Sequence, residues 1–150
     1  MSQSLANIVV HLVFSTKYRQ PVIMDGIRGE LHAYIIGILR KYDCCSIIIN
    51  SELDHVHILF SLSKNQALSK IVEEIKRGSS KWLKTKDAKY ANFYWQGGYG
   101  AFSVSQSQIE TVTFYIANQR EHHENTSFQD EMRALFVHNG ITFDERHLWD

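Results

Sequence analysis

The chain has 150 residues, 44% of them hydrophobic, and its 16 basic and 16 acidic side chains leave a formal net charge of zero. This composition favours one domain with a real core, and it excludes a disordered chain or a protein that coats nucleic acid through net charge alone. We expect no membrane-spanning helix, no secretory signal and no disulfide or zinc framework, since the only cysteines are the adjacent Cys44 and Cys45. The sequence therefore predicts a single cytoplasmic domain over residues 1–150.

The charges are unevenly distributed along the chain. Residues 64–90 carry a net charge of +5, whereas residues 121–150 carry −5. A local basic surface on a neutral protein suits an anionic partner that is bound at one place.

The first half of the chain alternates between strand and helix patterns. In chain order, we predict a strand over residues 5–14, a helix over 25–42, and strands over 44–50 and 51–60. A tight hairpin near Ser51 and Glu52 joins the last two strands.

The second half contains more helix. In chain order, we predict a helix over residues 67–84, a strand over 99–104 after a glycine-rich loop, and helices over 106–122 and 128–138. Ser105 is a good N-cap for the helix at 106–122, and Thr126 or Ser127 for the last helix, which Asn139 and Gly140 end.

The order β-α-β-β-α-β predicts an α+β, ferredoxin-like fold: an antiparallel sheet with two helices on one face, followed by two additional helices. Val56, Ile58 and Phe60 should face the two helices. His55 and His57 then lie on the opposite face, which is too apolar to be left bare. The helix at 106–122 is available to cover it, from this chain or from a partner chain.

The pair His55 and His57 has the spacing of a metal site. Side chains at i and i+2 of a strand share a face about 6–7 Å apart, so two imidazoles can converge on one ion. By itself this pattern is weak, because such a pair is more often ordinary surface. For His11, His122 and His123 we favour packing or surface roles.

Tyr115 and Gln119 are neighbours on one face of the predicted helix, since they stand at i and i+4. If this helix covers the histidines, it presents the Tyr115 hydroxyl to a substrate on the metal and the Gln119 carbonyl as a third ligand. Spacing alone favours the plainer alternative, an interface tyrosine and a solvent-exposed glutamine.

Basic side chains form a stripe on one face of the helix at 67–84. The stripe consists of Lys70, Arg77, Lys81 and Lys84. It is either a solvated helix surface or a site for phosphate groups.

Several ordered motifs carry a family resemblance along nearly the whole chain. They are Thr16-Lys17-Tyr18-Arg19, Asp54-His55-Val56-His57, Ser79-Ser80-Lys81-Trp82, Trp95-Gln96-x-Gly98-Tyr99-Gly100-Ala101-Phe102-Ser103, Tyr115-Ile116-x-Asn118-Gln119-x-x-His122-His123, Gly140-Ile141-x-Phe143-Asp144-Glu145 and Leu148-Trp149-Asp150. With these motifs, the sequence resembles the single-tyrosine HUH transposases, the TnpA-like enzymes of the smallest bacterial insertion sequences.

The resemblance implies a site and a reaction. His55, His57 and Gln119 would bind Mg²⁺ or Mn²⁺, although nitrogen ligands alone favour zinc or manganese. Tyr115 would be the nucleophile that cuts single-stranded DNA at hairpin-marked ends, joins the 5′ phosphate and leaves a 3′ hydroxyl. Another strand's 3′ hydroxyl then attacks the phosphotyrosine, so that element ends and target DNA are joined.

The resemblance also implies a homodimer with composite active sites, in which His55 and His57 come from one chain and Tyr115 can come from the other. Ala101, Phe102 and Val104, on an edge strand, are apolar enough to support such an interface. Two alternatives stay open: a domesticated relative that processes repeated genomic hairpins, and a non-catalytic, ferredoxin-like binder of single-stranded nucleic acid. Flanking DNA with hairpin ends would favour the mobile element.

Overall fold

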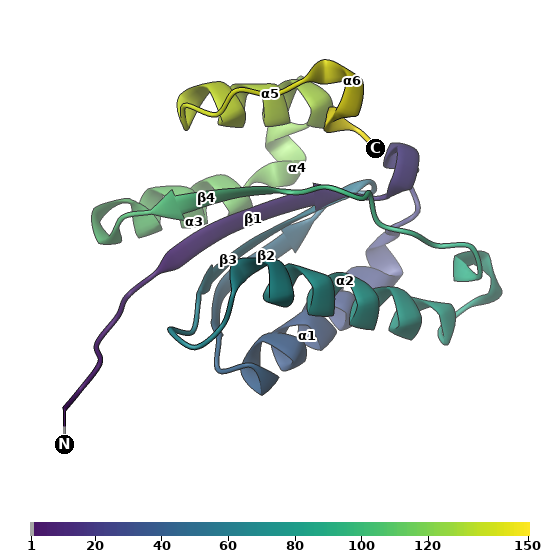
Figure 1. Cartoon of the computed structure of the whole chain (residues 1–150). Coiled ribbons are helices and arrows are strands. Elements are labelled where there is room, and N and C mark those ends of the chain that lie inside the picture. The colour runs from purple at the N-terminus through teal and green to yellow at the C-terminus, as the bar shows by residue number, and fades with distance from the viewer. Residues whose placement is uncertain (1) are drawn as a thin grey trace.

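A computed structural model describes residues 2–150 and shows one antiparallel sheet with helices on both faces (Figure 1). The strands are β1 (Val9–Ser15), β2 (Cys45–Ser51), β3 (His55–Ser61) and β4 (Gly100–Val104). The helices are α1 (Asp25–Lys41), α2 (Leu68–Lys84), α3 (Ile109–Ala117), α4 (Gln119–His122), α5 (Phe128–His138) and α6 (Glu145–Leu148), with short 3₁₀ turns η1 (Lys17–Arg19), η2 (Ala88–Tyr90) and η3 (Gln106–Gln108). No helix within this range is long and apolar enough to cross a bilayer.

The strands lie in the order β2-β3-β1-β4, and every neighbouring pair is antiparallel. This arrangement confirms the predicted α+β, ferredoxin-like fold. The register places His57 of β3 opposite Val13 of β1, and His11 of β1 opposite Phe102 of β4. The central strands thus bring the histidines of β1 and β3 side by side.

The main core lies between the sheet and helices α1 and α2. Val56, Ile58 and Phe60 are fully buried there, as their alternation predicted. Helix α1 contributes Leu31 and Ile35 to the same cluster. Burying an apolar side chain of this size stabilises the fold by about 1.5–3 kcal/mol, so this layer holds the strand that carries His55 and His57 firmly in place.

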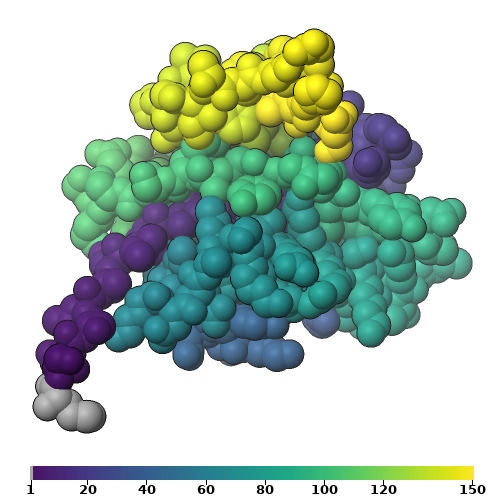
Figure 2. Space-filling view, in the orientation of Figure 1, coloured from purple at the N-terminus to yellow at the C-terminus, as the bar shows by residue number. Residues whose placement is uncertain are grey.

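Helices α3 and α5 cover the opposite face of the sheet. Ile116 of α3 packs against Val9 and Leu59, as expected for the helix predicted to cover this face. Helix α5 adds a second layer that the sequence did not suggest, and it forms a cluster of Val13, Phe102, Phe128, Met132 and Phe136. In the space-filling view the C-terminal helices form a continuous cap over this side of the molecule (Figure 2).

The docking of α5 corrects one expectation about the edge strand. Phe102, which we expected to support a dimer interface, is only 5% exposed because α5 covers it. Close packing at this point depends on Gly100, where an added Cβ would lie 2.7 Å from Met132 Cε and 3.4 Å from Phe136 Cε1. A side chain at this position would therefore have to displace the end of the Met132 side chain.

The helix predicted over residues 106–122 is broken, which corrects a second expectation. It divides into η3, α3 and α4, and the break between the last two falls at Asn118, with φ −102° and ψ 25°. The Asn118 side-chain amide donates to the Phe114 carbonyl at 2.8 Å. Such side chain to backbone bonds compete with the helical pattern, which explains why the helix stops here.

The ends of several elements also differ from the predictions. Strand β1 begins at Val9 rather than residue 5, because its partner β3 ends at Ser61, opposite Val9. Ser105 makes no capping hydrogen bond. At α5 the prediction is confirmed, since the Ser127 hydroxyl accepts from the Asp130 N–H at 3.1 Å and Gly140 follows with φ +69°.

Candidate active site

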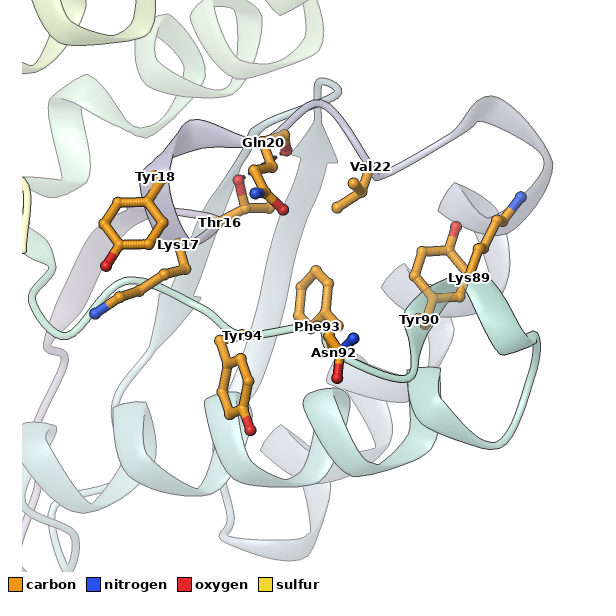
Figure 3. Close-up of a pocket in the computed structure, with 10 residues that line it drawn as sticks. All are labelled: Thr16, Lys17, Tyr18, Gln20, Val22, Lys89, Tyr90, Asn92, Phe93 and Tyr94. Carbon is orange, nitrogen blue, oxygen red and sulfur yellow. Dashed lines mark hydrogen bonds between the residues drawn. The ribbon is translucent and has the colours of Figure 1, made fainter.

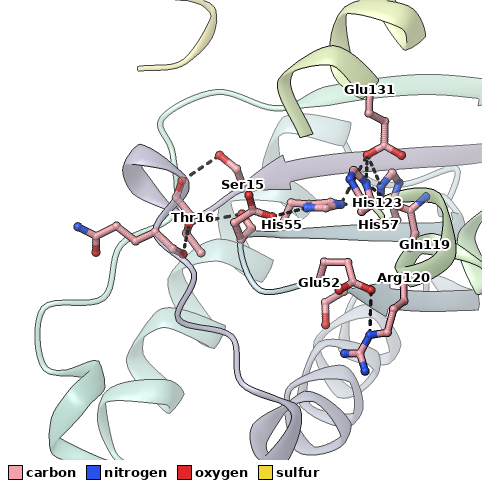
Figure 4. Close-up of polar contacts among 12 residues, drawn as sticks. Ser15, Thr16, Glu52, His55, His57, Gln119, Arg120, His123 and Glu131 are labelled. Carbon is pink, nitrogen blue, oxygen red and sulfur yellow. Dashed lines mark hydrogen bonds and ion pairs between the residues drawn. The ribbon is translucent and has the colours of Figure 1, made fainter. Parts of the chain in front are cut away.

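A cluster of imidazole and carboxylate groups lies between β3 and the helices that follow α3 (Figure 4). It comprises His55, His57, His123 and Glu131, whose ligand atoms all lie within 4.8 Å of one another. His55 and His57 are 1% and 0% exposed, and Glu131 is 2% exposed. Such buried polar groups need partners, and here they find them in each other.

Glu131 of α5 stands at the centre of the cluster. Its Oε1 atom lies 2.9 Å from His123 Nε2, 3.2 Å from His57 Nε2 and 3.5 Å from His55 Nε2. Several imidazole nitrogens therefore point at one oxygen, which is the convergent arrangement of donors that a metal site requires.

The second ring nitrogen of each histidine is held from outside the cluster. Nδ1 of His55 lies 2.6 Å from Asp54 Oδ1, and Nδ1 of His57 lies 2.8 Å from Nε2 of His11. Nδ1 of His123 lies 2.6 Å from the Thr126 carbonyl oxygen. Such outer partners fix the ring orientation of metal-binding histidines and leave Nε2 for the ion, so this donor set fits a divalent cation.

Gln119 contributes an amide oxygen to the same place. The side chain is fully buried, and its Oε1 lies 2.9 Å from His123 Nε2 and 3.3 Å from His55 Nε2. The plainer alternative, a solvent-exposed glutamine, is therefore wrong. Its role as a metal ligand remains a prediction.

Tyr115 of α3 reaches the cluster within the same chain. Its hydroxyl donates a hydrogen bond to Glu131 Oε2, and its ring meets the His57 ring edge-on with centroids 5.8 Å apart. Burial and the charge of Glu131 raise the pKa of Tyr115 well above its ordinary value. The hydroxyl is thus a protonated, weak nucleophile as long as no positive charge joins the cluster.

The charges of the cluster are set by burial and by Glu131. Burial lowers the pKa of His57, and burial together with His57 lowers the pKa of His11 to about 3, so both rings are neutral at pH 7. Burial acts to raise the pKa of Glu131, but hydrogen bonds from His123 and His57 lower it. Glu131 in turn raises the pKa of His123. The cluster is therefore a carboxylate surrounded by imidazoles.

Two of the hollows in the surface adjoin residues of the site. One, of about 480 Å³, lies between β4, α3 and α5 and is lined by His11, Tyr115 and Phe102. The other, of about 320 Å³, is lined by His55 and His123. A substrate can therefore approach both the hydroxyl and the imidazoles.

The basic stripe lies on α2, on the opposite side of the sheet (Figure 1). Lys70 and Arg77 form ion pairs with Glu74, at 3.1 Å for Lys70 Nζ. Lys81 and Lys84 have no acidic partner within ion-pair distance in the part of the chain that the structure describes. The predicted stripe thus reduces to two lysines that are available for an anionic partner.

Sequence reasoning missed two members of the cluster, His123 and Glu131. We favoured a packing or a surface role for His123; its side chain is only 13% exposed, so the surface alternative is wrong. A signal existed for Glu131, because Phe128, Met132 and Leu135 stand at −3, +1 and +4 from it, which places it in the middle of an apolar helix stripe.

Comparisons with known proteins agree with this architecture. The family described as "Transposase IS200 like" matches residues 4–119. The ISDra2 transposase TnpA of Deinococcus radiodurans is 24% identical over 116 residues, which cover 74% of this chain and 83% of that protein. The match to the family ends at Gln119, so His123 and Glu131 lie beyond it.

Solved structures share the fold. A crystal structure described as a transposase of Deinococcus radiodurans R1 superposes with a TM-score of 0.62 at 21% identity, covering 79% of this chain and 98% of that chain. A REP-associated tyrosine transposase bound to a REP hairpin superposes with a TM-score of 0.61 at 16% identity, covering 82% and 74%. With a family match over most of its length and this fold, the chain belongs to the IS200-like transposases, the single-tyrosine HUH family that its motifs resemble.

Proposed function

We propose that this protein cleaves and rejoins single-stranded DNA at hairpin-marked ends through a 5′-phosphotyrosine on Tyr115. One observation carries the proposal: the Tyr115 hydroxyl meets the cluster of His57, Glu131 and His123 in a single site. A transposase needs a nucleophile and a cation site within reach of the same phosphate.

His55, His57 and Gln119 would hold a divalent cation, Mg²⁺ or Mn²⁺, and His123 and Glu131 offer further ligand atoms. When bound, such a cation neutralises charge on the scissile phosphate and makes the phosphorus more electrophilic. It would also offset the negative charge of Glu131 that raises the pKa of Tyr115.

The protein's own groups account for the atoms that move. The Tyr115 oxygen forms a bond to phosphorus, the bond from phosphorus to the 3′ oxygen breaks, and that oxygen takes up a proton. Glu131 is placed to receive the phenol proton, because its Oε2 already accepts a hydrogen bond from the hydroxyl. Rejoining reverses these steps with a new 3′ hydroxyl. The energy of the phosphodiester bond is therefore conserved in the phosphotyrosine until the strands are rejoined.

The substrate's hairpins would bind through their phosphates at Lys81 and Lys84. Support comes from the related REP-associated transposase, whose structure is bound to a REP hairpin. Because that relative is bound to a REP hairpin, processing of repeated genomic hairpins is the second candidate function. Hairpin ends in the DNA flanking the gene would favour transposition.

The test is the covalent intermediate. A labelled single strand that contains the hairpin end should become attached to the wild-type protein, and the adduct should disappear with Tyr115→Phe while hairpin binding persists. Tyr99→Phe is the matched control, since Tyr99 lies directly before β4, outside the cluster. An adduct that survives Tyr115→Phe would show that another group is the nucleophile.

We further propose that the working form is a two-fold dimer, because strand exchange must hold two cleaved ends together. In the structure Tyr115 lies next to His57 of its own chain, so one chain already gathers a complete set of groups. If active sites form in trans, a purified heterodimer of a Tyr115→Phe chain and a His57→Ala chain recovers cleavage at one site. A dead heterodimer would favour sites formed within one chain.

A further inference from the structure

A small cavity lies beside the turn that follows β1 (Figure 3). It lies between residues 16–22 and residues 89–94 and has a volume of about 190 Å³. Pockets for drug-sized ligands measure roughly 300–1,000 Å³, so this one has room for a single ring system.

Tyrosines and lysines are paired around this cavity. Tyr18 is 69% exposed with Lys17 Nζ 5.3 Å from its ring centroid, and Tyr94 is 61% exposed with Lys84 Nζ 4.6 Å from its centroid. Exposed aromatic faces next to cations are what single-stranded nucleic acid requires, since bases stack on the rings and phosphates meet the lysines.

Two features of the segments around the cavity are unusual. The Tyr90 hydroxyl is buried in a residue only 1% exposed, and it has no hydrogen-bond partner within residues 2–150. Tyr18 and Arg19 both have positive φ, 56° and 55°, which costs about 1–3 kcal/mol each for residues other than glycine. Backbone held in such a conformation exposes the Tyr18 ring at the cavity's rim.

The cavity is connected to the metal ligands through one short chain of contacts. The Thr16 N–H donates to the Asp54 carbonyl at 2.8 Å, and the Asp54 carboxylate lies 2.6 Å from His55 Nδ1. On the other side, Lys84 of the basic stripe on α2 lies over the ring of Tyr94, which lines the cavity. A single strand bound at the cavity would therefore lie next to Lys84, one of the two lysines proposed to bind hairpin phosphates.

We infer that this cavity binds one unpaired nucleobase of the single-stranded DNA that leads to the scissile phosphate. The base stacks on the exposed rings of Tyr18 and Tyr94, while its phosphates face Lys17 and Lys84. The amides of Gln20 and Asn92, at the cavity wall, can read the base edge. This inference rests on the proposed function, which it deepens by adding a subsite for the substrate.

The test compares strands with and without bases in the Tyr115→Phe background, where no cleavage can occur. Affinity is measured by fluorescence anisotropy for a mixed-sequence single strand and for an abasic backbone of equal length. Stacking contributes about 1–3 kcal/mol per base, so the double variant Tyr18→Leu/Tyr94→Leu should bind the base-bearing strand at least about fivefold more weakly. It should bind the abasic strand as tightly as its parent does.

Matched variants separate stacking from structural damage. Tyr18→Phe/Tyr94→Phe keeps both rings and should retain affinity, and Tyr34→Leu, at an exposed tyrosine of α1, should also leave it unchanged. Equal binding by the leucine and phenylalanine variants, or an equal loss on the abasic strand, would overturn the inference. A parent protein that does not bind the single strand at all would overturn it as well.

A second measurement needs no substitution in the cavity. A strand carrying 5-iodouracil is photo-crosslinked to the protein, and the linked peptide should contain residues 17–20 or 92–94. Crosslinks confined to other segments would refute the subsite. The tyrosine adduct is scored separately on the wild-type protein, so a failed subsite and a failed nucleophile give different results.

Discussion

Replacing Glu131 with glutamine tests the centre of the cluster without reference to catalysis. The change keeps the shape of the side chain but removes the charge that accepts from His123 at 2.9 Å and from His57 at 3.2 Å. Hydrogen bonds to charged groups contribute about 1.5–3 kcal/mol, and a neutral amide retains part of each. We therefore expect Glu131→Gln to lower the free energy of unfolding of the metal-free protein by about 2–4 kcal/mol.

The assay is urea denaturation followed by circular dichroism, with a chelator present throughout. For a chain of this length the same loss lowers Tm by roughly 4–16 °C. The matched control is Asp130→Asn on the same helix, where the carboxylate is exposed and forms a 3.0 Å ion pair with Arg133. That control should cost less than about 1 kcal/mol, as surface pairs do. Equal, small losses in both variants would refute the placement of Glu131 in a buried network.

Three further predictions concern the cation, the DNA and the pH. Mn²⁺ at a hundredfold excess over its Kd should raise the free energy of unfolding of the wild type by about 2.7 kcal/mol, as measured by thermal melts. An equal gain in stability for His57→Ala would show that the ion binds elsewhere. Replacing Lys81 and Lys84 with alanine should weaken hairpin binding. It should also reduce the slope of log binding constant against log salt concentration by roughly one to two, because about 0.7–0.9 counterions are released per phosphate contact. An unchanged slope would show that the two lysines are ordinary surface residues. The pKa of His11 is about 3 in the folded protein and about 6.5 in the unfolded chain. The contribution of the neutral His11 ring to stability is therefore complete above the unfolded pKa, and it is lost as the pH falls from about 6.5 toward about 3. Between pH 7 and 5.5 the metal-free wild type should therefore lose about 1 kcal/mol more than His11→Gln, and parallel losses would contradict the buried, neutral ring.

The sheet and its faces could be predicted because each strand obeys a simple alternation. Val56 and Ile58 had to enter a core, which left His55 and His57 on the other face together with His11. The break at Asn118 could not be predicted in the same way. An asparagine within a helical pattern either faces solvent or bonds to the backbone, and only the surroundings decide between the two.

Glu131 shows where prediction from the sequence ends. It lies in an acidic C-terminal segment, and a glutamate in such a segment is usually on the surface. Its burial follows from packing between distant parts of the chain, because Phe128 and Met132 on either side dock against Val13 and Phe102. The periodicity of α5 indicated a buried stripe, but it did not say which surface the stripe would cover.

Gly100 of β4 leaves room for α5 to pack closely against the edge strand. Its missing side chain lets Met132 approach the edge strand, and Met132 adjoins Glu131 on α5. A single methyl group added to β4 would collide first with the end of the Met132 side chain, which would have to move aside. The residue that leaves room for this packing thus lies on the edge strand and is not one of the residues of the cluster.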